Sequence, residues 1–509
     1  MKFLNRYILI TSLTMLFFSS CSESFLDIAP AGRLTSESFL KTDEEVKTAI
    51  IGVYNLIQHD YSNGSWSNVY FIKNLPADDS LGGSSEGDNT ALQNIDDFTI
   101  QTDNIRLLNI WTGFYNTINA ANKIINGVDA DTDAKTEMIA EAKAIRAFTY
   151  FDMVTLFGGV PLLTVNPSSE ADYHKPRATA AEVYAQIEKD FTEAIADLPL
   201  KSEYSAGDKF RFSKGTAQGF LGKVYLYEEK YSEAAAQLAA VISSGEYGLE
   251  PNFADVWTKE KEFGIESLFE ISYTSQESYD WGNFPWQGEI ESNIEIQLQG
   301  PRNNIFDFSN SSLPIRNGWG FNMPSAKIAH AFEAENDVVR GSATVMSAAD
   351  FIATGGVIVN QVFHDYEGYM RLKYATYNSE TSDQGIPELN YTTNWRILRY
   401  ADILLLAAEA YHFSGDDGKA LIEINKVRER AQLPDISSGG DMFQAIVKER
   451  QLELAFEGSR YWDLVRWGLA QQELGDLGYQ TGKNELFPIP QNEIIANNEI
   501  GPEDQNPGY

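Results

Sequence analysis

The chain has 509 residues, of which 43% are hydrophobic and 12% aromatic, and its formal net charge is −34. This composition provides a substantial apolar core and excludes an intrinsically disordered protein. The acidic balance argues against nucleic acids and anionic lipid headgroups as partners, and favours a neutral ligand over a polyanionic one. The length accommodates one large domain or three of ordinary size.

The N-terminus has the features of a secretory signal peptide over residues 1–20. Lys2 and Arg6 precede an uncharged apolar run from Tyr7 to Phe18. Small residues then precede Cys21, the only cysteine, in the lipobox pattern of bacterial lipoproteins. We predict that Cys21 becomes a lipid-carrying N-terminus; an ordinary signal peptide is the alternative. Removing residues 1–20 takes away two basic and no acidic residues, so the charge becomes −36, and lipid has to provide the membrane attachment.

Residues 21–42 are predicted to form a leader between the lipid and the folded body. Thr42 to Glu45 has capping-box spacing and predicts a helix to about Gln58. Residues 59–104, rich in Gly, Ser and Asp, predict a long loop region of the kind that often carries function. Apolar residues at helical spacing then predict helices within 105–125, 138–156, 180–198, 214–229 and 232–243.

Two helix pairs far apart in the chain have the same pattern. Gly222 is followed by an aromatic residue and three small or aliphatic residues, and Ala408 is followed by the same types at identical offsets. These are the small-residue and aromatic positions of a tetratricopeptide repeat, where a small residue lets two helices approach closely. The two pairs are Gly222, Tyr225, Ala234, Leu238, Val241 and Ala408, Tyr411, Ala420, Ile424, Val427.

Between these pairs the sequence changes character. Residues 245–395 are irregular and rich in Trp, Tyr, Asn and Gly, with short strands predicted near 357–359 and 369–374. Helices return after Ala401, including one long helix over 447–467, and a Pro-rich tail at 471–509 is expected to lie extended across the body. The predicted fold class is mainly α: residues 43–509 form a single domain in which tetratricopeptide-like helix pairs (about 43–244 and 396–470) carry a loop-rich insertion (about 245–395).

Motifs for catalysis and metal binding are weak. Ser85 fits the G-x-S-x-G pattern, but polar loop sequence on both sides argues against a nucleophile elbow. Asp129, Asp131 and Asp133 resemble the start of a calcium loop but lack its Gly and Glu positions, which leaves only a weak surface calcium site. No histidines lie at zinc-ligand spacing. These motifs predict no cofactor, with the weak calcium site as the one metal candidate, and they leave open a pair of catalytic carboxylates among the 73 acidic residues.

A run of charged residues near the C-terminus invites a catalytic interpretation. Glu457, Arg460, Asp463 and Arg466 follow at three-residue intervals and would line one face of the long helix. We interpret them as a structural ion-pair network.

Aromatic residues gathered on loops are the stronger functional signal. Residues 279–286 contain four aromatic residues separated by Gly, Asn and Pro, without a helical or strand period. Flat rings beside amides suit a neutral polar ligand with apolar faces, such as a sugar; the alternative is that the rings fix a long loop to the scaffold. The candidate ligand residues are Trp66, Tyr70, Tyr279, Trp281, Asn283, Trp286, Asn317 and Trp319.

The chain resembles the SusD/RagB family of lipoproteins, and the resemblance runs nearly from end to end. The C-terminal motifs are the most specific in combination. The landmarks, in order, are Cys21 with Phe25-Leu-Asp, Gly52-Val-Tyr54, Arg399-Tyr-Ala-Asp402, Asn425-Lys-Val-Arg428, Glu449-Arg450, Glu453 to Arg460, Asp463-Leu-Val-Arg466-Trp467, Pro488-Ile-Pro490 and Gln505 to Tyr509.

This resemblance implies a helical protein that is lipid-anchored on the outer face of the outer membrane and sits as a hinged lid on a TonB-dependent, SusC-type transporter. It implies a protein that is not an enzyme and that binds a glycan or, in some branches, a peptide, with ligand rings in regions such as 60–90 and 275–325. Two alternatives stay open: a surface-anchored glycoside hydrolase, and a helical-repeat adaptor that holds protein partners.

Overall fold

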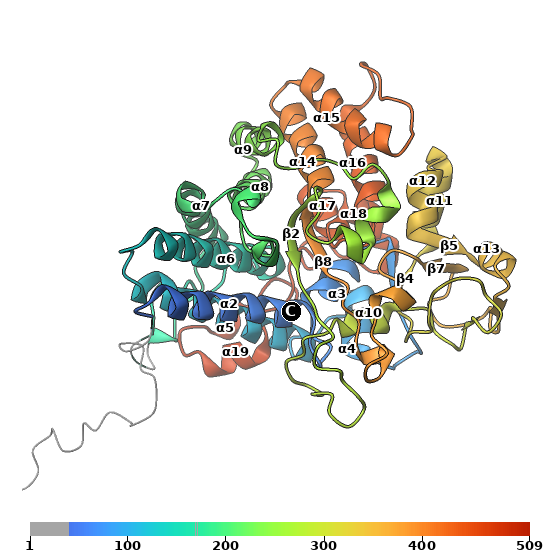
Figure 1. Ribbon diagram of the computed structural model, residues 1–509, viewed down its shortest axis with the longest axis horizontal. Helices are drawn as coiled ribbons and strands as arrows, with labels where there is room; N and C mark the ends of the chain where they lie inside the picture. Colours follow the sequence, from blue (N-terminus) through green and yellow to red (C-terminus); the bar gives the residue numbers. More distant parts are fainter. Residues whose placement is uncertain (1–39, 168, 170–171) are drawn as a thin grey trace, which may run out of the picture.

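The computed structural model describes residues 40–167, 169 and 172–509 (Figure 1). The predicted signal peptide, Cys21 and the leader up to residue 39 lie outside the described residues. Within the described part of the chain, no helix is both long enough and apolar enough to cross a membrane.

Helices dominate the described residues. Short strands form four separate antiparallel pairs, β1 with β4, β2 with β8, β3 with β6 and β5 with β7. The helices are α2 (Asp43–Tyr61), α3 (Val69–Asn74), α4 (Thr90–Asp96), α5 (Ile105–Gly127), α6 (Asp133–Phe157), α7 (Ala180–Asp197), α8 (Lys214–Tyr227), α9 (Tyr231–Ser243), α10 (Ile294–Gln299), α11 (Ala326–Glu335), α12 (Val338–Thr344), α13 (Ala348–Ala353), α14 (Tyr400–Phe413), α15 (Asp417–Arg430), α16 (Met442–Glu453), α17 (Arg460–Arg466), α18 (Ala470–Leu474) and α19 (Gln491–Ala496). The strands are β1 (Ser80–Gly83), β2 (Ser267–Ile271), β3 (Phe306–Asp307), β4 (Phe321–Pro324), β5 (Val345–Ser347), β6 (Val357–Ile358), β7 (Tyr369–Arg371) and β8 (Trp395–Arg399).

The scaffold is a continuous stack of helices. Helices α5 to α9 pack in chain order, α14 packs against α9, and α15 packs against α14 (Figure 1). The two helix pairs that the sequence pattern identified are therefore direct neighbours, and Tyr231 stacks on Phe413 across their junction. A Cβ placed on Gly222 would lie 2.6 Å from Leu238 of α9, so the small residue allows the close approach that the pattern predicts. The mainly α fold with tetratricopeptide-like pairs is confirmed.

Local sequence signals set several helix starts. The Thr42 hydroxyl accepts from the amide of Glu45 while the Glu45 carboxylate accepts from the amide of Thr42, which is the predicted capping box. Thr179 and Glu182 form a second one at the start of α7. Each box satisfies amide groups that a helix start otherwise leaves unpaired.

Three predictions of local structure were wrong. Residues 59–104 contain α3, β1 and α4, because Asn68 and Asn89 accept hydrogen bonds from the first turns of these short helices. The predicted long helix over 447–467 is two helices, α16 and α17, with Phe456 and Gly458 at positive φ between them. The insertion also contains helices α10 to α13, which its composition did not indicate.

The charged run near the C-terminus is a buried ion-pair network, as interpreted, although it does not lie on one helix face. Glu457 precedes α17 and pairs with Arg399 and Lys373. Arg460 binds both oxygens of Asp78 at 2.8 and 2.9 Å. Further pairs join Asp463 to Arg450 and Arg466 to Glu409. These contacts tie α17 to the helices around it.

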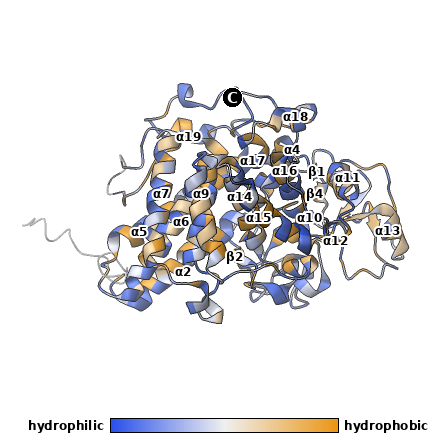
Figure 2. Cartoon of the chain, turned by 90° about the horizontal axis from the view of Figure 1, so that it is seen from above, coloured by the Kyte–Doolittle hydropathy of each residue, from blue (hydrophilic) through white to orange (hydrophobic). Residues whose placement is uncertain are grey.

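One large hydrophobic core extends through the helical stack into the insertion. In Figure 2 the helices carry both hydrophobic and hydrophilic residues along their ribbons, as expected when one face is buried. A smaller core around Phe306 and Phe351 lies under β3, β6 and α13. The tail is not wholly extended: it forms α19 and short turns while crossing the body (Figure 1).

Candidate functional site

Four tryptophans from three separate loops form a row of ring contacts, which we call the aromatic arc. Trp281 and Trp286 are nearly parallel, with ring centroids 6.1 Å apart. Trp286 meets Trp66 edge-on at 6.4 Å, and Trp66 meets Trp319 at 5.6 Å. Trp281 and Trp286 remain 50% and 44% exposed, which is unusual for large apolar rings. All four were sequence candidates, and the structure brings them together.

The loop after α2 holds Trp66 in a left-handed conformation. Its φ is 58°, a value that is rare for a bulky residue. The Asn63 side chain fixes this geometry: its Oδ1 accepts from the amides of Ser65 and Ser67, at 3.0 and 3.2 Å. Its Nδ2 donates to the carbonyls of His59 and Ser67. The Trp66 ring is therefore positioned by a side chain three residues away.

The Trp66 loop is bonded directly to the Trp286 turn. The Gly64 amide donates to the carbonyl of Gly288, and the Gln287 amide donates to the carbonyl of Gly64. A Cβ on Gly64 would lie 2.4 Å from the Pro285 carbonyl oxygen, so this approach needs a glycine. The relative position of the two rings is thus set by backbone hydrogen bonds.

Trp319 is held between α10 and β4. Its amide donates to the Gln297 carbonyl at 2.9 Å, and Arg302 donates to the Trp319 carbonyl at 2.8 Å. Beside it lies a hollow of about 330 Å³, which we call the Trp319 pocket. Gln297 lines this pocket, and its Oε1 is buried and accepts no hydrogen bond from the described residues. Arg302, Asn317 and Trp66 also line it.

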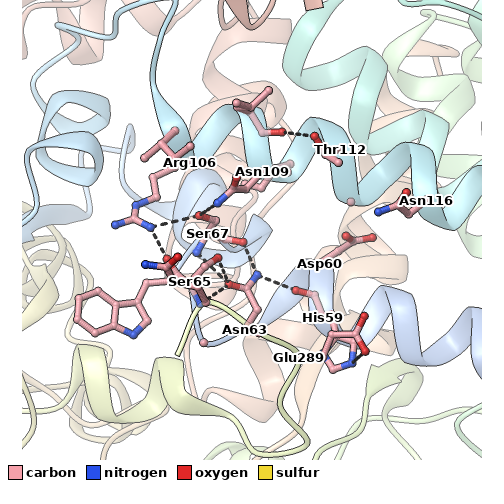
Figure 3. Close-up of a pocket in the computed structure, with 18 of the residues that line it drawn as sticks. His59, Asp60, Asn63, Ser65, Ser67, Arg106, Asn109, Thr112, Asn116 and Glu289 are labelled. Atoms are coloured by element: carbon pink, nitrogen blue, oxygen red, sulfur yellow. Dashed lines mark hydrogen bonds and ion pairs between the residues drawn. The ribbon is translucent and has the colours of Figure 1, made fainter. Parts of the chain in front are cut away.

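A larger hollow of about 960 Å³ lies on the other side of Trp66, and we call it the α5 groove. Trp66 is the only described residue that lines both hollows. One wall is the polar side of α5, formed by Arg106, Asn109, Thr112 and Asn116 (Figure 3). The end of α2 and the turn at 286–289 contribute further lining. A cavity of this size, with amide and hydroxyl groups along one wall, accommodates a ligand with several hydroxyl groups.

Two titratable residues at the end of α2, His59 and Asp60, line the α5 groove beside the charged side chains of Arg106 and Glu289. Burial lowers the pKa of His59, which opposes the effect of the nearby Glu289 and Glu291, and so favours the uncharged imidazole. Burial raises the pKa of Asp60 well above its ordinary value, although the Thr117 hydroxyl donates to it at 2.9 Å. The guanidinium of Arg106 is already bonded to Ser67 and the Ser65 carbonyl.

The other four candidate residues lie in different surroundings, two of them buried and two of them accessible. Tyr70 is buried, donates to the carbonyl of Phe456 at 2.8 Å, and stacks on Trp395. Tyr279 is also buried and packs on Phe284, so the expectation for both tyrosines is corrected: they fix the loops. Asn283 is exposed and caps its own turn by accepting from the amide of Asp280. Asn317 lines the Trp319 pocket while donating to the Phe306 carbonyl.

The surroundings of the weak calcium-loop and G-x-S-x-G motifs do not support a metal site or a catalytic serine. Among the described residues, no three His, Cys, Asp or Glu side chains lie close enough to hold a metal ion, so Asp129, Asp131 and Asp133 do not converge. Asp131 instead pairs with Lys135 at 2.7 Å, which favours its charged form. Ser85 does follow a strand, β1, contrary to expectation, yet its hydroxyl has no hydrogen bond to a described histidine or carboxylate.

The residues of the α5 groove were missed from the sequence. Asn109, Thr112 and Asn116 recur every three or four residues along one side of an amphipathic helix. Such a stripe is the ordinary sign of a solvent-facing side. The segment 286–289, which is far away in the sequence, lines the same cavity and thereby makes this stripe one of the cavity walls.

Two family models match this chain. One, described as "SusD family", matches residues 340–509. The other, described as "Starch-binding associating with outer membrane", matches residues 24–226. Among solved structures, a "Laminarin binding SusD-like protein" is 33% identical, with a TM-score of 0.82, and the match covers 92% of this chain and 99% of that one. The chain belongs to the SusD family.

Other SusD relatives agree along nearly the whole length. "SusD-like protein P2" of Formosa agariphila is 28% identical, over 99% of this chain and 100% of that protein. "Surface glycan-binding protein A" from Bacteroides thetaiotaomicron, solved in complex with laminarihexaose, is 25% identical with a TM-score of 0.79, over 92% of this chain and 100% of that one. The second name describes a glycan-binding protein, and neither of these two relatives is named as an enzyme.

Proposed function

We propose that this protein captures a neutral glycan on the cell surface and delivers it to a TonB-dependent, SusC-type transporter in the outer membrane. The observation that carries the proposal is the aromatic arc, three of whose four rings line two hollows that also contain amide side chains. Pyranose rings have apolar C–H faces that stack on indole rings, while their hydroxyl groups need amide and carbonyl partners. The arc and its hollows offer both.

Relatives support the choice of ligand class. One similar structure is named as laminarin-binding, and another was solved with laminarihexaose. Laminarin-type glucans are therefore the first probes for this chain. The net charge of −34 favours a neutral glycan over an anionic one.

The binding proposal is tested by calorimetry on the purified protein with a panel of neutral glycans that begins with laminarin. We expect Trp66→Ala and Trp286→Ala to weaken binding about tenfold or more, because each removes a stacking surface. Tyr173→Ala is the matched control, since Tyr173 is an exposed aromatic residue outside the arc. Unchanged affinity in both tryptophan variants, with the wild type binding, would reject this site.

Membrane attachment and delivery are tested separately. We propose that lipid on Cys21 anchors the protein on the outer face of the outer membrane. Cys21→Ala is expected to abolish surface labelling on intact cells and to release the protein into the periplasm. Purification of the wild type from membranes is expected to recover a TonB-dependent transporter as a stoichiometric partner. Surface labelling of Cys21→Ala at the wild-type level would overturn the anchor.

A further inference from the structure

The α5 groove continues away from the aromatic arc along one helix. At its near end, Arg106 hydrogen-bonds the carbonyl of Ser65, the residue before Trp66. Asn116 lines the groove ten residues further along α5, about 15 Å away at 1.5 Å per residue. In Figure 3, Arg106, Asn109, Thr112 and Asn116 follow one another along this wall. Both tryptophans of the groove, Trp66 and Trp286, belong to the arc.

The groove and the arc offer different kinds of contact. The arc presents rings, which suit the faces of a chain of sugars. The wall formed by α5 presents amides and hydroxyl groups, which suit a sugar residue that is held at its edges by hydrogen bonds. The side chains of Asn116 and Asn492, which line the groove, form no hydrogen bond with another described residue. The buried imidazole of His59 also lines the groove, and neither of its ring nitrogens makes a hydrogen bond within the described residues; Nε2 lies 3.5 Å from the Glu289 carboxylate.

The two hollows meet at a single ring. Since Trp66 lines both, a sugar stacked on Trp66 borders the Trp319 pocket on one side and the α5 groove on the other. If the main chain of the glycan follows the arc toward Trp319, it leaves the α5 groove unoccupied. Its volume, about 960 Å³ against about 330 Å³ for the Trp319 pocket, leaves space for more than the edge of that main chain.

We infer that the ligand is a branched neutral glycan, whose main chain lies on the aromatic arc and whose side branch leaves at Trp66 to enter the α5 groove. This inference rests on the proposed function, since it assigns a second part of the same ligand. Asn109, Asn116 and Asn492 are the branch-binding residues, and they determine specificity for branched over linear chains.

The test compares linear and branched oligosaccharides on one backbone at a time. Laminarihexaose is paired with laminarihexaose that carries one β-1,6-linked glucose, and maltohexaose, mannohexaose and xylohexaose are each paired with a singly branched counterpart. For the backbone that binds, we expect the wild type to prefer the branched member about tenfold, the effect of roughly 1.4 kcal/mol from one or two added hydrogen bonds.

Asn116→Trp fills the far part of the groove with an indole. It is expected to remove the preference and to leave affinity for the linear member within about twofold of the wild type. Lys123→Trp, two turns further along α5 and outside the groove, is the matched control and is expected to keep the preference. Thermal unfolding of both variants checks that the fold is intact.

The outcomes separate the two proposals. Equal affinity of the wild type for both members of the bound pair overturns the branch inference alone. If Asn116→Trp loses the same affinity for the linear and the branched oligosaccharide, the branch inference is also overturned, because the groove would then hold the main chain of the glycan. Absence of wild-type binding to every backbone overturns the proposed function, and the branch inference falls with it.

Discussion

Tyr70 lies face to face with Trp395, with ring centroids 3.8 Å apart and ring planes inclined by 11°. Its hydroxyl donates to the carbonyl of Phe456, which joins the Trp66 loop region to the turn between α16 and α17. We expect Tyr70→Ala to lower the free energy of unfolding by about 3–5 kcal/mol, and Tyr70→Phe by only about 1 kcal/mol. Urea unfolding measures both. A stable Tyr70→Ala variant that has lost glycan affinity would instead place Tyr70 in the ligand site.

Asn63 is predicted to act on binding through Trp66. Asn63→Ala removes the acceptor for the amides of Ser65 and Ser67, and Trp66 then loses the side-chain support for its φ of 58°. Calorimetry is expected to show affinity reduced about tenfold for the glycan that the wild type binds, with an unchanged far-UV circular dichroism spectrum. Asn126→Ala serves as the control, because that asparagine bonds carbonyls at the far end of α5. Wild-type affinity in Asn63→Ala would show that the Trp66 loop keeps its shape unaided.

Adjacent aspartates are predicted to affect stability with opposite signs. Burial raises the pKa of Asp79 to about 7, and the charge of Asp78 adds to this effect. The folded state therefore keeps a proton that the unfolded state loses near pH 4, so stability falls as pH rises from about 4 to about 7, by on the order of 4 kcal/mol. Asp79→Asn is expected to remove this loss and to be more stable than the wild type at pH 8.

Asp78 supplies the matched comparison. Burial alone would raise its pKa, but the hydrogen bonds and charge of Arg460, together with Lys327, outweigh burial and lower it. Its contribution is therefore present above the unfolded pKa and is lost in acid. Asp78→Asn is expected to destabilise the protein by about 3 kcal/mol at pH 7, since it leaves Arg460 buried without its partner. Chemical unfolding at pH 5 and pH 8 checks both variants, and the same sign in both would refute the assignment.

Two glycines within helices are predicted to respond oppositely to Ala. Gly222→Ala places a methyl group 2.6 Å from Leu238 and should cost about 1–3 kcal/mol by overpacking the α8–α9 contact. Gly52→Ala, in α2, meets no atom within 4 Å and should stabilise by about 0.5–1 kcal/mol through helix propensity. Thermal unfolding gives both values. A neutral Gly222→Ala variant would mean that α9 shifts to make room.

Much of the scaffold could be predicted because its signals are local. Thr42 and Thr179 specify helix starts through residues three positions away, and the offsets around Gly222 and Ala408 specify helix pairs. The break at Gly458 could not be predicted, because apolar residues continue at helical spacing across it.

The site was predictable only in part. The rings of the arc were recognisable because exposed tryptophans among Gly and Asn have no place in a periodic element. Tyr70 and Tyr279 have the same local sequence character, and their burial depends on residues such as Trp395 and Asn390 that lie more than 100 positions away. The wall of the α5 groove was missed for the same reason, since the turn that covers it comes from another part of the chain.

The β2–β8 pair joins residues 267–271 to residues 395–399, so the segment between them leaves and rejoins the scaffold at one place. That segment contributes Trp281, Trp286 and Trp319, whereas Trp66 comes from outside it. This segment is not independent of the helices, because Arg340 of α12 pairs with Glu449 and Glu453 of α16 at 2.6 and 3.1 Å. Three of the four arc rings therefore lie on one continuous stretch of the chain, so a recombination event that replaced this stretch would exchange most of the arc and would also have to preserve its ion pairs with α16.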